Sequence, residues 1–120
     1  MFNVISYKNK NGKSEVEEYI LSLQTKEDKS SKIQFQKIVS CINMLAKYGT
    51  NLGMPYIRYI DNGIWELRPL RNRTLFAYWK DNTFLLLNIF MKKTQKIPEI
   101  ELGRAKRMLK DFIRRNKDNG

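Results

Sequence analysis

The sequence predicts an α+β protein in which a helix pair covers one face of an antiparallel sheet, in the order βααβββα. Apolar residues at helical spacing fill the region before residue 49, and three strand-like runs separated by turn residues follow between residues 64 and 91. A last amphipathic segment begins at Pro98. With 120 residues, 42% of them hydrophobic, the chain suits one domain over residues 1–120 with a substantial core. The second face of the sheet is expected to be open.

The first elements are a strand and a helix. Alternating side chains predict a short strand over Phe2–Tyr7, and Asn9–Gly12 is typical of a turn. Ser14 is a good N-cap, and three glutamates follow it in the first turn, where carboxylates suit the helix dipole. We expect this helix to end near Leu23.

A second helix begins at Thr25 or Ser30 and ends at Gly49, a natural C-terminal stop. Cys41 lies at the flank of its apolar stripe and is expected to pack rather than react, because the chain has no histidine to activate it. A single cysteine also excludes an internal disulfide and fits a reducing compartment. The stripe consists of Ile33, Phe35, Ile38, Val39, Ile42, Leu45 and Ala46.

The sheet follows a loop over Asn51–Gly63, which has an extended piece near Tyr56–Ile60. Turn-prone links at Pro69–Asn72 and Asp81–Asn82 separate the strands and predict two successive hairpins. The strand-like runs are Ile64–Arg68, Arg73–Lys80 and Phe84–Met91.

The last helix opens with Pro98 at its first position, where proline is well tolerated. Arginines and lysines occupy most positions outside its apolar face. That face is formed by Leu102, Ala105, Met108, Leu109 and Phe112.

Charge is the most informative bulk property. The formal net charge is +11, and residues 68–115 alone hold thirteen basic and four acidic residues. Such a field attracts polyanions, although its sign does not separate RNA from DNA, acidic protein or anionic lipid, and a surface tuned for solubility is the plain alternative. No apolar run reaches membrane length and no signal peptide is visible, so we expect a cytoplasmic protein without membrane contact.

Strand alternation gathers polar side chains on one face of the sheet. If Trp65 faces the helices, Glu66 and Arg68 face the open side, and Arg73 and Trp79 join them from the next strand. Lysines at positions 92, 93 and 96 follow the last strand.

This set permits RNA cleavage, in which the 2′-hydroxyl attacks the neighbouring phosphate. Arginine forks match phosphate oxygens and stabilise developing charge, by roughly 3–4 kcal/mol per good donor. A lysine with a lowered pKa can transfer protons, and Trp79 can stack on a base. The plainer alternatives are a surface pair of Arg68 with Glu66, a core Trp79, and lysines that merely solvate a strand end. No motif indicates a metal or a cofactor, and none is expected.

Two runs of residues carry a resemblance to a known family. Residues 64–69 read IWELRP, and residues 90–98 read FMKKTQKIP after a leucine-rich strand, with Arg73 heading an aromatic strand between them. In this order and separation they resemble the HigB-like branch of the RelE/ParE toxin superfamily, which is also described as phage-derived Gp49-like proteins. The resemblance implies a RelE-like fold and a ribosome-dependent endoribonuclease that cuts mRNA and inhibits translation.

The resemblance also implies site residues and partners. Arg68 and Arg73 fall on typical catalytic positions, and Lys92 and Lys93 are carried over as basic residues after the final strand. The expected partners are a HigA-like antitoxin with a helix-turn-helix, mRNA on the ribosome together with ribosomal RNA, and operator DNA only through the antitoxin. Contacts to the flanking RNA are expected from Arg58, Arg71, Trp79 and Lys96.

Two other functions fit the same sequence. ParE-like members of the superfamily poison DNA gyrase by binding and cut no RNA. A non-catalytic, phage-derived nucleic-acid-binding module would use the same positive surface only to hold a phosphate backbone. The arginines, lysines and KKTQK run favour the RNase.

Overall fold

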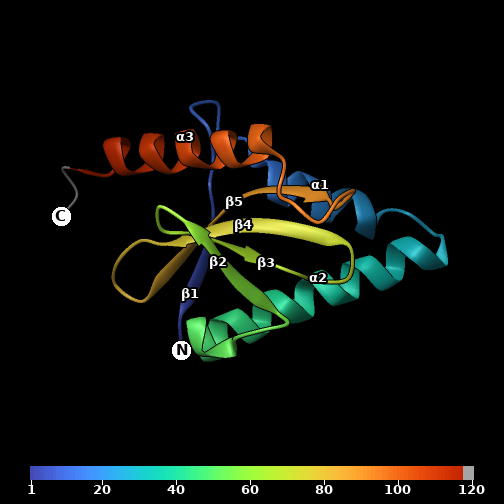
Figure 1. Cartoon of the computed structure of the whole chain (residues 1–120). Coiled ribbons are helices and arrows are strands. Elements are labelled where there is room, and N and C mark those ends of the chain that lie inside the picture. The colour runs from blue at the N-terminus through green and yellow to red at the C-terminus, as the bar shows by residue number, and fades with distance from the viewer. Residues whose placement is uncertain (118–120) are drawn as a thin grey trace.

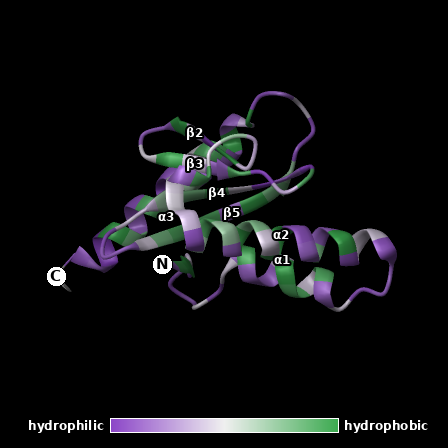
Figure 2. Ribbon diagram, turned by 90° about the horizontal axis from the view of Figure 1, so that it is seen from below, coloured by the Kyte–Doolittle hydropathy of each residue, from purple (hydrophilic) through white to green (hydrophobic). Residues whose placement is uncertain are grey.

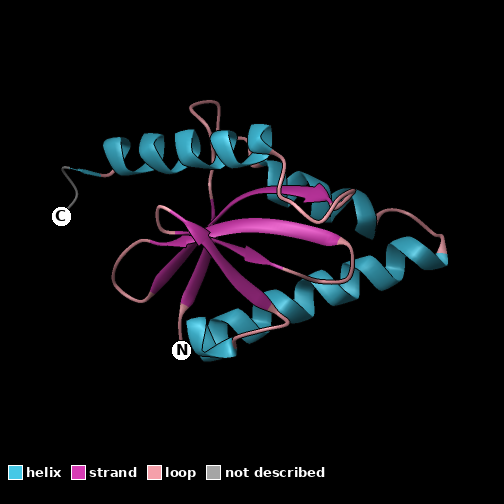
Figure 3. Cartoon of the chain, viewed as in Figure 1, coloured by secondary structure: helices cyan, strands magenta, loops and turns pink. Residues whose placement is uncertain are grey.

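The computed structural model describes residues 1–117, and it contains three α-helices and a five-stranded sheet (Figures 1 and 3). The α+β class expected from the sequence is confirmed, with one strand more than expected. In chain order the elements are β1 (Asn3–Ser6), α1 (Glu15–Gln24), α2 (Lys29–Tyr48), a 3-10 turn η1 (Gly49–Leu52), β2 (Ile57–Asp61), β3 (Ile64–Leu67), β4 (Asn72–Tyr78), β5 (Thr83–Met91) and α3 (Glu99–Arg115).

The sheet has the order β1-β5-β4-β3-β2 and is mixed. Strands β2 to β5 pair antiparallel in sequence order, whereas β1 pairs parallel with β5. The expectation of a wholly antiparallel sheet is therefore wrong at this one pairing. Parallel neighbours need a long connection, and here α1, α2 and three strands separate the two. The additional strand, β2, is the extended piece suspected in the loop before residue 63.

Two tight hairpins follow from turn residues in left-handed conformations. Asn62 and Gly63 have φ of 50° and 79° between β2 and β3, and Asp81 and Asn82 have φ of 52° and 57° between β4 and β5. Two consecutive positive φ angles are typical of the type I′ turn, whose twist matches that of paired strands. The turn between β4 and β5 lies where the sequence predicted one, whereas the pairing of β2 with β3 across Asn62 and Gly63 was not predicted.

The helix ends also follow local chemistry. Ser14 caps α1 as predicted, since its hydroxyl accepts a hydrogen bond from the Glu17 backbone amide at 3.1 Å. Asp28 caps α2 in the same way, so this helix begins between the two predicted starts. Gly49 ends α2 with φ of 60°. Pro98 is the N-cap of α3 and not its first helical residue.

Helices cover both faces of the sheet, so the expectation of one open face is wrong. Figure 2 shows α1 and α2 side by side, and their apolar residues pack with Ile57, Leu67 and Phe76 of the sheet. On the opposite face, Leu102 and Phe112 of α3 pack against the second hydrophobic layer. The apolar face of α3 requires this partner, because most of the stability of a helix in a protein comes from the packing of its apolar face. That layer's buried residues are Ile64, Leu75, Ala77, Leu85, Leu87 and Ala105.

Helix α3 covers only part of its face. Polar side chains occupy the same face beside the start of α3, at the end of the sheet where β3 ends and β4 begins. This architecture is consistent with the RelE-like fold that the resemblance implies. Within residues 1–117, no helix combines the length and the apolar character needed to cross a membrane.

Candidate functional site

A buried carboxylate lies at the centre of the polar end of the sheet. Glu66 is the third residue of β3, its side chain is 1% exposed, and it lies within 4 Å of three arginines. Arg58 Nε donates to Glu66 Oε1 at 2.9 Å, Arg68 Nε lies 3.3 Å from the same oxygen, and Arg73 Nε lies 3.8 Å from Oε2. The interpretation of Arg68 and Glu66 as a surface pair is therefore wrong.

The arginines approach from three neighbouring strand segments. Arg58 lies opposite Glu66 in the β2–β3 ladder, Arg68 follows β3 two residues later on the same face, and Arg73 is the second residue of β4. In all three ion pairs the arginine atom is Nε. Because Nε is the inner nitrogen of the guanidinium, the ion pairs with Glu66 do not use the terminal nitrogens. Of these, Nη1 of Arg68 donates to Met54 Sδ at 3.5 Å, and Nη1 of Arg73 donates to backbone carbonyls. The carboxylate thus orients the three side chains as a group.

Arg73 is the most constrained of the three. Its side chain is 7% exposed, and its Nη1 donates to the backbone carbonyls of Leu70 at 2.9 Å and Asn72 at 2.7 Å. Burial lowers the pKa of Arg73 from its ordinary value. The negative charge of Glu66 partly offsets this lowering, and the positive charges of Arg68 and Arg58 add to it. Leu70 adopts φ of 58°, a conformation rare for this residue type. The strained loop therefore presents a carbonyl that fixes the guanidinium through Nη1, and among residues 1–117 no hydrogen bond engages Nη2.

The segment between β5 and α3 forms the other wall of the site. Lys92 continues the β4–β5 pairing, with its backbone amide donating to the Arg71 carbonyl at 2.7 Å. Lys93 and Lys96 are exposed, and the hydroxyl of Thr94 donates to the Lys96 carbonyl at 2.9 Å within this segment. All three lysines line one pocket with the three arginines and Glu66. Six cations thus face one carboxylate.

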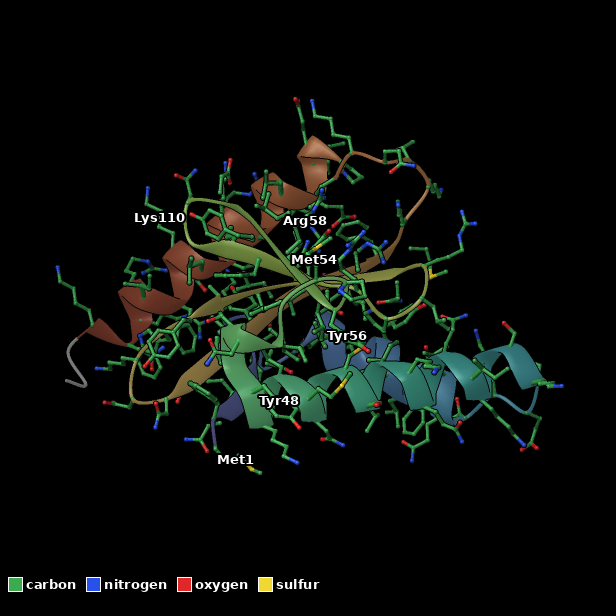
Figure 4. The ribbon with its side chains drawn as sticks, turned by 60° about the horizontal axis from the view of Figure 1, so that its bottom comes forward. Met1, Tyr48, Met54, Tyr56, Arg58 and Lys110 are labelled. Atoms are coloured by element: carbon green, nitrogen blue, oxygen red, sulfur yellow. The ribbon has the colours of Figure 1, made fainter. Side chains whose placement is uncertain are left out.

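The residues predicted to contact flanking RNA lie in this pocket or beside it, with one exception. Arg58 and Lys96 line it, and Arg71 lies in an adjoining hollow that shares Arg73, Lys92 and Lys93 with it. Figure 4 shows Arg58 near the N-terminal end of α3.

Trp79 lies elsewhere. It follows β4, six residues beyond Arg73, a separation of roughly 20 Å along an extended strand. Its ring packs edge-on against Phe112 of α3 with centroids 4.9 Å apart, and Lys80 Nζ lies over it at 4.9 Å. The structure does not bring Trp79 to the arginines, and its contacts are those of a partly buried packing residue.

Glu66 is more central to the site than its place in the sequence indicates. Alternation correctly placed it on the face of Arg68. Its role as the shared partner of three arginines depends on Arg58, whose strand was only suspected. The sequence did offer one signal of this role, because Glu66 is a carboxylate inside a strand with arginines on the neighbouring strand segments.

The site can bind a phosphate group by its chemistry. Guanidinium groups held by a buried carboxylate offer fixed donors, and the lysines add mobile positive charge. Since the cations outnumber the carboxylate six to one, an anionic ligand compensates charge that the protein leaves unbalanced.

Fold and site together define an α+β protein of RelE-like architecture with a cationic pocket at one end of its sheet. The profile of the family described as phage derived protein Gp49-like matches residues 19–110. The chain therefore belongs to the Gp49-like family, a RelE-like, toxin-type family. No curated protein sequence matches it significantly.

Proposed function

We propose that this protein is the toxin of a type II toxin–antitoxin system, of the HigB kind, and an endoribonuclease that cleaves mRNA on the ribosome. The observation that carries the proposal is the pocket in which Glu66 orients Arg58, Arg68 and Arg73 opposite Lys92 and Lys93. Membership of a toxin-type family supports it.

The proposed reaction is an internal transesterification. The 2′-hydroxyl loses its proton and attacks the adjacent phosphorus while the bond to the 5′-oxygen breaks. The products are a 2′,3′-cyclic phosphate and a 5′-hydroxyl end. Arg68 and Arg73 stabilise the extra negative charge of the pentavalent phosphate. Lys92 or Lys93 assists this charge stabilisation or the proton transfer, in which the 2′-hydroxyl gives up a proton and the leaving 5′-oxygen takes one up. The isolated protein cuts free RNA slowly, because the ribosome supplies the in-line orientation of the 2′-hydroxyl.

The proposed partners follow from the same charge. Arg71, Arg58 and Lys96 flank the pocket and would hold adjacent RNA phosphates. A HigA-like antitoxin with a helix-turn-helix would neutralise the toxin by offering carboxylates to this basic region, and it would carry the complex to operator DNA. A neutral or basic antitoxin interface would contradict this part of the proposal.

The test is induced expression in a bacterium, with mRNA 5′ ends mapped before and after induction. Wild type is compared with Arg73→Ala and Arg73→Lys, and Lys37→Ala on the exposed surface of α2 serves as control. For wild type and control, the proposal expects growth arrest with new cuts inside translated codons. For both Arg73 variants, it expects mRNA cleavage to fall by at least 100-fold. Lysine retains the charge but not the fork, so a purely electrostatic binding module would tolerate Arg73→Lys.

Three results would count against the proposal. Arrest with intact mRNA would favour gyrase or another target, and absence of arrest would favour a binding module. Full activity of folded Arg73→Lys would refute the role given to the guanidinium. Circular dichroism and thermal unfolding of each purified variant exclude loss of the fold as the cause.

A further inference from the structure

A second concentration of positive charge lies on the outer side of α3, outside the pocket. Three cations of α3 recur there at spacings of three and four residues, which places them on one side of the helix. They extend over about 10 Å at 1.5 Å per residue. Lys117 follows just beyond the end of the helix. We call this row, together with the lysines of the β1–α1 loop, the α3 basic face; the row consists of Arg107, Lys110 and Arg114 of α3 and of Lys117 after it.

Most cations of the α3 row are left without an ion-pair partner among the described residues. Within residues 1–117 no carboxylate forms an ion pair with Arg107, Lys110 or Lys117, whereas Arg104 and Lys106, which lie nearer the sheet and α1, are both paired. Arg114 pairs with Asp111 at 2.6 Å but remains 73% exposed. The side chains of Arg107, Lys110 and Lys117 are exposed.

The fold adds a second segment, about 100 residues away in sequence. Tyr7 Oη donates to Asp111 Oδ2 at 2.6 Å, and Arg115 donates both to Asp111 and to the Lys8 carbonyl. These bonds fasten the β1–α1 loop to the C-terminal half of α3, where Figure 1 shows the loop rising behind the helix. The exposed lysines of that loop are Lys8, Lys10 and Lys13.

The loop is itself fixed in shape. The Asn9 side chain accepts hydrogen bonds from the backbone amides of Asn11 at 2.9 Å and Lys13 at 3.1 Å, and the Asn9 amide donates to the Lys13 carbonyl. Its lysines therefore occupy defined positions beside α3, and the surface gathers seven cations from two segments. Such preorganised charge binds a polyanion with less loss of conformational entropy than a mobile basic tail.

We propose that the α3 basic face binds the phosphate backbone of double-helical RNA, as a docking surface separate from the cleavage pocket. The outer side of a helix is convex and offers regularly spaced point charges, which suits backbone contact and shape recognition rather than base reading. Helix α3 begins at the pocket, where Ile97 and Pro98 form part of the lining, and its basic row leads away from it. In Figure 4, Lys110 lies farther along α3 from Arg58. RNA held at this face thus lies beside a strand in the pocket.

The choice of RNA rests on the proposed function, and the folded RNA of the ribosome is the partner that would supply such helices. The test measures binding alone, by fluorescence anisotropy of a labelled 20-base-pair RNA duplex across 50–300 mM KCl. The variant is Arg107→Ala/Lys110→Ala/Lys117→Ala. The matched control, Lys26→Ala/Lys29→Ala/Lys32→Ala, removes the same charge from exposed positions near the start of α2.

We expect the α3 variant to bind at least tenfold more weakly at 150 mM KCl, with a salt slope reduced by about two to three. The control should remain within twofold of wild type. Equal losses in both variants would show a net-charge effect and overturn the proposal, as would no loss in the α3 variant. Tighter wild-type binding to a DNA duplex of equal length, or to phosphatidylserine vesicles, would overturn the assignment of RNA.

The two proposals fail separately. Intact mRNA after induction, with α3-dependent duplex binding, would refute the nuclease and leave the docking surface standing. Codon-specific cuts, together with duplex binding by the α3 variant that equals wild type, would refute the docking surface and leave the nuclease standing.

Discussion

Removing the charge of Glu66 tests the central feature of the site. Glu66→Gln keeps the shape of the side chain but leaves Arg58, Arg68 and Arg73 facing one another without their anion. Losing one member of a buried ion pair costs about 3–5 kcal/mol. The cost is smaller here, because the side chains of Arg58 and Arg68 are 43% and 20% exposed and solvent screens part of their repulsion.

We therefore expect Glu66→Gln to lower the free energy of unfolding by about 2–3 kcal/mol, or roughly 1–2 M in the urea midpoint. Urea unfolding followed by circular dichroism measures this, and Glu27→Gln, an exposed carboxylate between α1 and α2, is the matched control. The control should change by less than about 0.5 kcal/mol.

Glu66→Gln should also change the response of the protein to anions, and in the opposite direction to its effect on stability. Without Glu66 the pocket has a larger positive excess, so inorganic phosphate should stabilise Glu66→Gln more than it stabilises wild type at equal ionic strength. A urea midpoint for Glu66→Gln equal to that of wild type would refute the view that the carboxylate holds the arginines together. Equal responses of both proteins to phosphate would refute the view that the pocket binds anions.

Three further predictions concern the rest of the fold. Hydrogen bonds from Tyr7 and Arg115 lower the pKa of Asp111 to about 2, so its stabilising effect should be complete above pH 4 and disappear as the pH falls through 2. Asp111→Asn should therefore have a lower urea midpoint than wild type at pH 7 but not at pH 2, and a constant difference would contradict this. Burial raises the pKa of the Cys41 thiol, and a thiol reagent should label it only in urea, so rapid native labelling would disprove its burial. Gly49→Ala should cost about 1–3 kcal/mol in thermal unfolding, because φ is 60° and the new Cβ would lie 2.6 Å from the Phe2 ring, and an unchanged melting temperature would exclude this strain.

Local patterns predicted much of the fold. Ser14 and Gly49 mark helix ends because their own side chain or lack of one decides the backbone conformation there. The turn at Asp81–Asn82 and the apolar alternation of β3 likewise act over a few residues, so they are visible in sequence. The same alternation predicted that Glu66 and Arg68 share a face.

Other features required the tertiary structure. No local pattern encodes contacts between distant segments. Such contacts decide the parallel pairing of β1 with β5 and the covering of the second face of the sheet by α3. They also decide that Trp79 packs against Phe112 and not beside the arginines.

The chain's charge and the types of its site residues were determined by the sequence alone. Only the tertiary structure decided that Arg58, Arg68 and Arg73 share one buried carboxylate, and that the loop of Lys8 lies against Arg115. The physical reason is that electrostatic function depends on distance and burial, and both are set by packing between elements rather than by composition.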